Sequence, residues 1–189
     1  MEQENGGNEM ITSQDKQYAV LASLAAGFIE MTAREADPGG YVRTKLGEAC
    51  KRFLAAAAYY KASGFNDDDL AKATAIFDQA EAMVKKAYGT SRIHKDAVYI
   101  SMAAALAAEV FDHGKIGEYG HGKLAAAFDY LQKATDTYAG KKYMGPAIRK
   151  TGRVSERVID LVRNTFTPLR VMRPVGGRLR GRDGRFISA

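Results

Sequence analysis

The sequence has one cysteine and no long apolar run, and each scarcity excludes a class of protein. Cys50 alone cannot form an internal disulfide or a thiolate metal cage, so we expect a reducing, cytoplasm-like location. No run reaches the roughly 18 consecutive apolar residues of a membrane span, so we expect no membrane contact. The acidic, polar start over residues 1–7 lacks the basic and apolar regions of a secretory signal.

Acidic residues are scarce in the C-terminal quarter. Residues 141–189 contain 13 Lys and Arg but 3 Asp and Glu, a balance of +10. Residues 1–140 contain 15 and 19, a balance of −4, so the two parts add to the formal net charge of +6. The basic character therefore belongs to one segment, and such asymmetry bears on the choice of partner.

The body of the chain has helical periodicity. The whole chain of 189 residues, of which 46% are hydrophobic, suits one domain with an arm. Apolar residues recur at three- and four-residue spacing, bounded by glycine, proline or acidic residues. This pattern predicts an all-α fold, either an antiparallel bundle or stacked helical hairpins, after a disordered polar N-terminus over 1–12. Six helices are expected in the domain 13–166, over 13–36, 41–62, 67–88, 94–112, 123–138 and 146–166.

Details of these helices follow from the same pattern. Ser13 or Asp15 can cap the first helix, and Leu54 and Leu70 fall on the predicted apolar stripes of the second and third. Short loops favour antiparallel pairing of successive helices from the third to the sixth.

A faint internal echo relates the third and fifth helices. Ala73, Phe77 and Ala80 match Ala127, Leu131 and Ala134 at an offset of 54 residues. The small-large-small pattern resembles the second helix of a tetratricopeptide repeat, but that family's first-helix signals are missing and its repeat is shorter. Ordinary helix packing explains the echo better.

Chemical motifs occur only as near-misses. Gly117–Lys123 fits most of a phosphate-loop pattern, but Leu124 stands where Ser or Thr should hold magnesium, so we expect a connector between helices. His113 and His121 flank this segment without the spacing of a metal motif, and His94 lies elsewhere. Cys50 has no evident base and is expected to be a core residue. We therefore expect no catalytic residue, no metal site and no cofactor.

The arm over residues 167–189 is the most informative segment. Its basic residues are all arginine, whose planar group binds phosphates and carboxylates in a bidentate manner. Prolines and glycines exclude a helix, and apolar residues between the charges indicate docking on a surface. The expected contacts are Arg170, Arg173, Arg178, Arg180, Arg182 and Arg185, with Val171, Leu179 and Phe186 as apolar anchors.

Three alternatives for the arm stay open: it binds nucleic acid, it lies on an acidic surface within a larger assembly, or it is a solvated tail. The ending Gly181–Ile187 resembles the basic, glycine-punctuated termini of some tailed-phage structural proteins, which would imply a virion component. We expect a non-catalytic binding or assembly protein, oligomeric or part of an assembly. An enzyme of another family is the competing class.

Overall fold

The computed structural model describes residues 12–36, 38–62, 64–88, 95–113, 118–142 and 145–167. These residues form helices without any strand, which confirms the all-α prediction. The helices are α1 (Ser13–Ala36), α2 (Gly40–Lys61), α3 (Asp67–Tyr88), α4 (Lys95–His113), α5 (Glu118–Lys142) and α6 (Gly145–Phe166).

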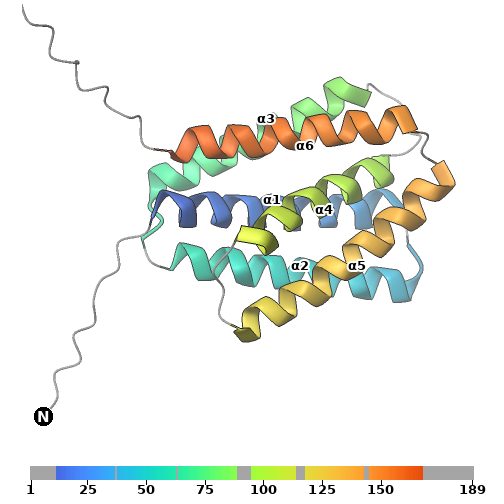
Figure 1. The fold of residues 1–189 in the computed structure, drawn as a ribbon, viewed down its shortest axis with the longest axis horizontal. Helices are drawn as coiled ribbons and strands as arrows, with labels where there is room; N and C mark the ends of the chain where they lie inside the picture. Colours follow the sequence, from blue (N-terminus) through green and yellow to red (C-terminus); the bar gives the residue numbers. More distant parts are fainter. Residues whose placement is uncertain are drawn as a thin grey trace, which may run out of the picture.

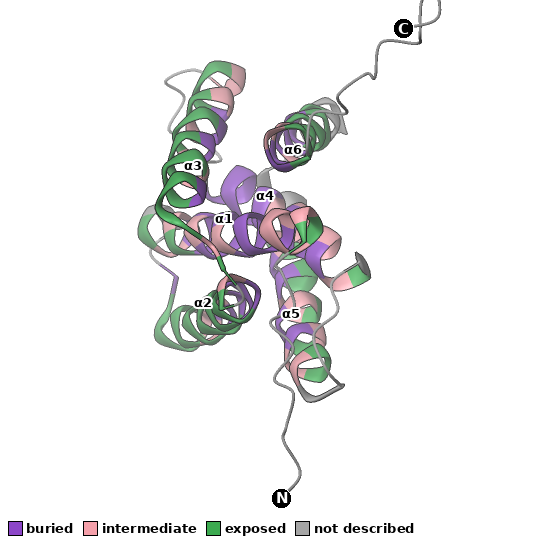
Figure 2. Cartoon of the chain, turned by 90° about the vertical axis from the view of Figure 1, so that its left-hand side faces the viewer, coloured by how far each residue is buried: buried purple, intermediate pink, exposed green. Residues whose placement is uncertain are grey.

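The six helices stack in three layers of two. Helices α1 and α4 form the middle layer, with α2 and α5 on one side and α3 and α6 on the other (Figure 2). Successive helices run in roughly opposite directions (Figure 1). The middle layer is therefore covered on both sides, and it carries most of the core.

Helix α1 is the centre of this core. It packs against α2, α4 and α6, and the side chains from Tyr18 to Ile29 are buried apart from Ser23 and Gly27, which are partly exposed. Phe28 lies 6.2 Å from Phe77 of α3 and 6.0 Å from Tyr99 of α4, measured between ring centroids. A helix that is apolar nearly all round can only be stable between other helices.

Gly27 permits the close approach of α3 to α1. A Cβ atom at this position would lie 2.5 Å from the Cε2 atom of Phe77, closer than real Cβ contacts come. The absence of a side chain therefore lets the Phe77 ring lie against the α1 backbone.

Capping boxes start two of the helices. Thr12 Oγ1 accepts a hydrogen bond from the Asp15 amide at 3.1 Å, and Asp15 Oδ2 accepts one from the Thr12 amide at 3.0 Å. Asn66 and Asp69 form the same reciprocal pair before α3. The cap of α1 is thus Thr12, one residue before the predicted Ser13, because its side chain reaches the third amide of the helix.

Two predicted core residues are exposed. Leu54 is 51% exposed and Leu70 is 52% exposed, so both predictions were wrong. Helix α2 packs mainly on α1 and α5, and the alanines Ala56 and Ala57 take the buried positions beside Phe53. Leu54 lies at the edge of the apolar stripe of α2, next to Phe53. The neighbouring helices, and not the sequence spacing, decide which edge of the stripe is buried.

Helix pairing follows the layers more than the chain order. Helices α4 and α5 pack together as predicted, but α3 packs mainly on α6 and α1, and α5 on α4 and α2. Helices α3 and α4 pack little against each other, as do α5 and α6, so these two predicted pairings were wrong. The central α1 separates the outer layers, and a short loop fixes only where the next helix begins.

Helix α5 is longer than predicted. It begins at Glu118, so Gly120 and Gly122 belong to its first turns instead of to a connector. No neighbour lies within 4 Å of a Cβ built at Gly122. Glycine costs about 1 kcal/mol in a helix interior, and here the tertiary packing of α5 overrides that preference.

Among the described residues, none of the helices is both long enough and apolar enough to cross a membrane.

Candidate anion-binding groove

Helix α6 separates charged from apolar residues cleanly. Val154, Val158 and Val162 recur every four residues and are buried. Lys150, Arg153 and Arg157 follow a similar spacing on the exposed side. The burial of the valines against α1 and α4 therefore turns these cations outward, beside α3.

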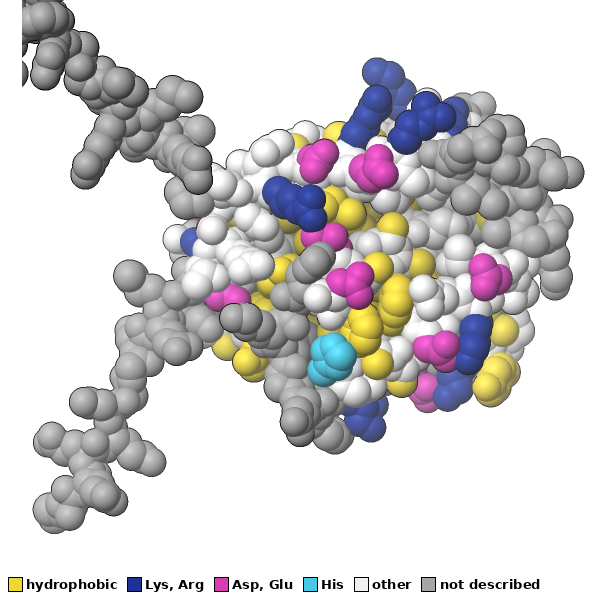
Figure 3. Space-filling view, in the orientation of Figure 1, with side chains coloured by type: hydrophobic (Ala, Val, Ile, Leu, Met, Phe, Trp, Pro, Cys, Tyr) yellow, Lys and Arg dark blue, Asp and Glu magenta, His cyan; other side chains and the backbone are white. Residues whose placement is uncertain are grey.

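A groove of about 700 Å³ lies between α3 and α6. Its apolar part consists of Met83, Ala87 and Val154, and its basic part consists of Lys86, Lys150, Arg153 and Arg157. No carboxylate is among these described lining residues. Figure 3 shows Lys and Arg side chains gathered at the edge of the molecule where α3 and α6 lie. Four cations thus surround an apolar floor.

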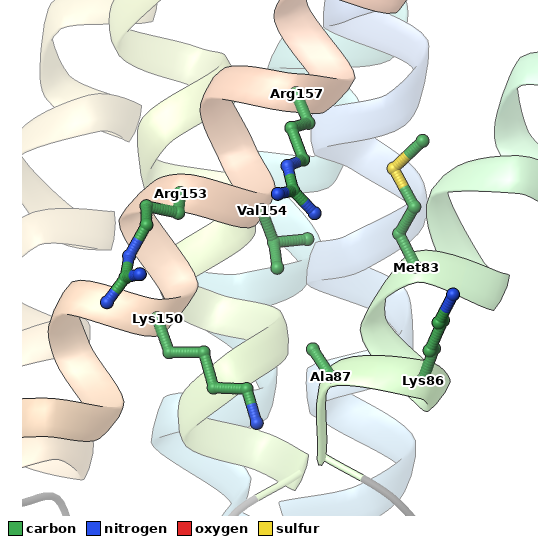
Figure 4. Close-up of a pocket in the computed structure, with 7 residues that line it drawn as sticks. All are labelled: Met83, Lys86, Ala87, Lys150, Arg153, Val154 and Arg157. Atoms are coloured by element: carbon green, nitrogen blue, oxygen red, sulfur yellow. The ribbon is translucent and has the colours of Figure 1, made fainter.

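The cations differ in direction. Lys150 and Arg157 extend from α6 toward α3, while Arg153 extends along the outer side of α6 and Lys86 stands on α3 (Figure 4). Lys150 and Arg157 are therefore the residues placed to contact a ligand inside the groove, and Arg153 and Lys86 lie at its rim.

Contacts at one end hold the two walls of the groove together. The Tyr88 hydroxyl of α3 hydrogen-bonds to Thr151 Oγ1 of α6. The Lys150 ammonium lies 5.2 Å from the centroid of the Tyr88 ring, within the range of a cation–π interaction. Farther along α6, Arg163 pairs with Glu109 of α4. These contacts fix the position of α6 relative to α3 and to the middle layer.

The positive charge of the groove is not neutralised locally. Within the described part of the chain, the side chains of Lys86, Arg153 and Arg157 form no ion pair, whereas the neighbouring Lys85 lies 2.7 Å from Glu81. Concave surfaces with charge of one sign concentrate their electric field and attract counter-ions. The groove is therefore suited to an anion.

A second groove, of about 510 Å³, lies between α2 and α5, and its described lining contains two carboxylates among four cations. The Nζ atom of Lys45 lies 2.8 Å from Oε2 of Glu48, and the Nζ atom of Lys133 lies 2.6 Å from Oδ2 of Asp129. The hydrogen bond between Lys45 and Glu48 lowers the pKa of the carboxyl and raises the pKa of the amine. Paired charges attract an external anion less, so the α3–α6 groove is the stronger candidate.

Comparison with known proteins identifies no relative. The chain matches no family model, no curated protein and no solved structure. The groove must therefore be interpreted from its own chemistry.

The residues predicted as contacts lie elsewhere. Arg170, Arg173, Arg178, Arg180, Arg182 and Arg185, and the anchors Val171, Leu179 and Phe186, all fall outside the described residues. The predicted partner surface in the arm is thus not tested, and it remains a prediction.

The histidines and the cysteine form no cluster in the described residues. His94 and the side chain of His113 lie outside them, and the exposed His121 stacks on Phe111 with 4.5 Å between ring centroids. No group of three His, Cys, Asp or Glu side chains comes together among the residues described. Cys50 is half-buried against the core, and burial raises the pKa of its thiol.

The sequence contains a signal for part of the groove in the charge pattern of α6. Of the +10 balance of residues 141–189, the arm from residue 168 onward contributes +5, so an equal share lies before it. Lys150, Arg153 and Arg157 stand at i, i+3 and i+7, which is one face of a helix. Lys86 had no such signal, because only the approach of α3 to α6 brings it to this face.

Proposed function

We propose that this protein is a non-catalytic, helical nucleic-acid-binding protein whose contact surface combines the α3–α6 groove with the arm. The observation that supports the proposal is the groove itself, with four cations and no carboxylate among its described lining residues. Phosphodiesters offer repeated negative charges, and binding to Lys and Arg releases the counter-ions condensed on them.

The distribution of charge favours a long anion over a single small one. The cations of α6 are followed along the chain by six more arginines in the arm, with one aspartate among them. A chain of phosphates can contact both sets at once, whereas one small anion can neutralise only one of them. Arginine also suits phosphate because its planar group donates two parallel hydrogen bonds.

The test is a binding titration with the full-length protein. Fluorescence anisotropy with a labelled single-stranded 12-mer should show an affinity that falls with salt. Replacing both Lys150 and Arg157 with Ala should lower the log–log salt slope by roughly 1.4, since each phosphate contact on a single strand contributes about 0.7. A matched double variant, Arg34→Ala with Lys51→Ala, removes the same charge from exposed positions on α1 and α2 and should leave the slope nearly unchanged. No measurable binding by the unmodified protein would refute the proposal.

A second candidate function is assembly into a larger particle, as a structural component. The observation in its favour is the exposure of two large side chains of α2, Leu54 at 51% and Tyr59 at 55%. Contact with a protein partner would remove this apolar area from water. Light scattering that gives a monomer for the full-length protein at high concentration would count against self-assembly.

Catalysis is not part of the proposal. The described lining of the two grooves includes no His, Cys or Ser, and its carboxylates, Glu48 and Asp129, each pair with a lysine. An acid–base or nucleophilic mechanism needs such groups free and within reach of a substrate.

A further inference from the structure

We infer that the α3–α6 groove binds single-stranded nucleic acid, with bases against its apolar floor and phosphates on the cations Lys150 and Arg157. This inference rests on the proposed function and narrows its ligand. The inference depends on the groove having both apolar and basic residues. A site that bound only phosphate would need the basic residues and would gain nothing from the apolar ones.

The floor supplies the contact for a base. Met83 and Ala87 are partly buried and Val154 is buried, so their side chains present apolar surface at the bottom of the groove. Met83 is unbranched and polarisable, and such side chains adapt to flat and irregular ligands. Every base has an apolar face, so this contact is tolerant of sequence.

The cations inside the groove supply the contacts for phosphates. Lys150 and Arg157 project from α6 toward α3 across the floor (Figure 4). A ligand that lies on Met83 and Ala87 therefore has its charged edge beside these cations. An apolar face and an anionic edge in one repeating unit are the features of a nucleotide strand.

The groove disfavours a duplex. Its volume of about 700 Å³ is in the range of pockets that enclose small organic ligands, so it suits a few nucleotides. In a duplex the base faces are stacked on one another, and only the grooves and the phosphates are accessible. A duplex would touch the rim and leave the floor empty.

The experiment compares three ligands of the full-length protein by fluorescence anisotropy at one salt concentration. They are a thymidine 12-mer, an abasic 12-mer with the same number of phosphates, and a blunt hairpin with a 12-base-pair stem. We expect the thymidine strand to bind at least about fivefold more tightly than the abasic strand, because base contact is lost in the latter. We also expect it to bind more tightly than the hairpin.

A pair of variants on one helix locates the contact. Ala87→Asp places a negative charge on the floor and should weaken binding of the thymidine strand at least about tenfold. Ala82→Asp places the same charge on α3 at an exposed position outside the groove and should change binding less than about twofold. Circular dichroism checks that both variants remain helical.

The outcomes separate the inference from the proposed function. If no ligand binds, the proposed function fails and the inference fails with it. If all three ligands bind equally and the two aspartate variants behave alike, nucleic-acid binding stands and the single-strand inference is wrong. If a polyglutamate peptide of matched charge displaces the thymidine strand as well as unlabelled strand does, the groove recognises charge alone, as an acidic protein segment would offer, and the inference is also wrong.

Discussion

Tyr60 is a buried polar group that the fold leaves unsatisfied. Its side chain is 2% exposed, and within the described part of the chain its hydroxyl has no hydrogen-bond partner. The centroid of its ring lies 5.5 Å from the ring centroid of Tyr18 and 5.4 Å from that of Tyr59. The ring thus stabilises the core through its apolar area, while the hydroxyl loses its hydration without compensation.

Replacing Tyr60 with Phe should therefore stabilise the protein. The phenyl ring keeps the packing and removes the uncompensated hydroxyl, so we expect the free energy of unfolding to rise by about 1 kcal/mol. Urea denaturation of the two proteins measures this difference. Tyr18→Phe is the control, because the Tyr18 hydroxyl accepts a hydrogen bond from Gln14 at 2.8 Å and should give no such gain.

Tyr60 also makes the free energy of unfolding depend on pH. Burial raises the pKa of the Tyr60 phenol well above its ordinary value of about 10. The unfolded chain therefore ionises first, so this contribution to stability is complete below pH 10 and is lost as pH rises above it. A Tyr60→Phe variant that loses stability between pH 9 and 11 as steeply as the parent would contradict this assignment.

At the scale of the helices, one ion pair joins α1 to α3. Lys16 Nζ lies 2.6 Å from Asp69 Oδ2, and the Asp69 side chain is 5% exposed. The same carboxylate accepts a hydrogen bond from the backbone amide of Asn66 at 3.2 Å, and this bond is part of the capping box of α3. Asp69 therefore fixes both the start of α3 and its position against α1.

Removing Asp69 should destabilise the protein more than removing its partner. Asp69→Ala loses the carboxylate half of the capping box and leaves Lys16 unpaired, for which we expect a cost of about 2–3 kcal/mol. Lys16→Met should cost less, because the Asp69 carboxylate keeps its hydrogen bond from the Asn66 backbone amide. A double-mutant cycle measured by urea denaturation gives the coupling between the two residues. A coupling energy near zero would show that the pair contributes nothing beyond the cap.

The sequence predicts the helices well and their neighbours less well. The predicted bounds of α1, α2, α3, α4 and α6 agree closely with those observed, because each helix has its own stop signals. Helix α5 was predicted too short, since glycines were given their usual role as breakers. The exposure of Leu54 and Leu70 depends on which helices lie next to them. The spacing of apolar residues within one helix does not show which other helices pack against it.

For the molecule as a whole, the groove is a product of tertiary structure. Lys86 and Arg157 lie about seventy residues apart in the chain, and only the three-layer arrangement brings α3 and α6 side by side. The basic stripe of α6 could be read from the sequence, but neither the floor nor the opposite wall could. The charge asymmetry of the chain thus points to the segment that contains the α6 wall of the groove, while the prediction in the arm stays untested.

Deleting residues 168–189 should separate folding from binding. The described helices end at Phe166, so the remaining chain keeps every core contact described here, and the unfolding midpoint should change little. The six arginines of the arm are lost, and nucleic-acid affinity should fall with a smaller salt slope, by roughly 0.7 for each single-strand phosphate contact removed. Thermal unfolding and anisotropy titrations measure the two effects separately.

Point variants in the full-length chain identify the arm's partner. For nucleic acid, Arg180→Ala and Arg182→Ala should weaken binding more than Leu179→Ala or Phe186→Ala, because exposed cations contact the phosphates. For a neighbouring subunit, the apolar variants should impair assembly at least as much, since buried anchors hold such contacts. Binding and assembly that survive deletion of the arm unchanged would contradict both assignments, and the α3–α6 groove would then have to account for any nucleic-acid binding alone.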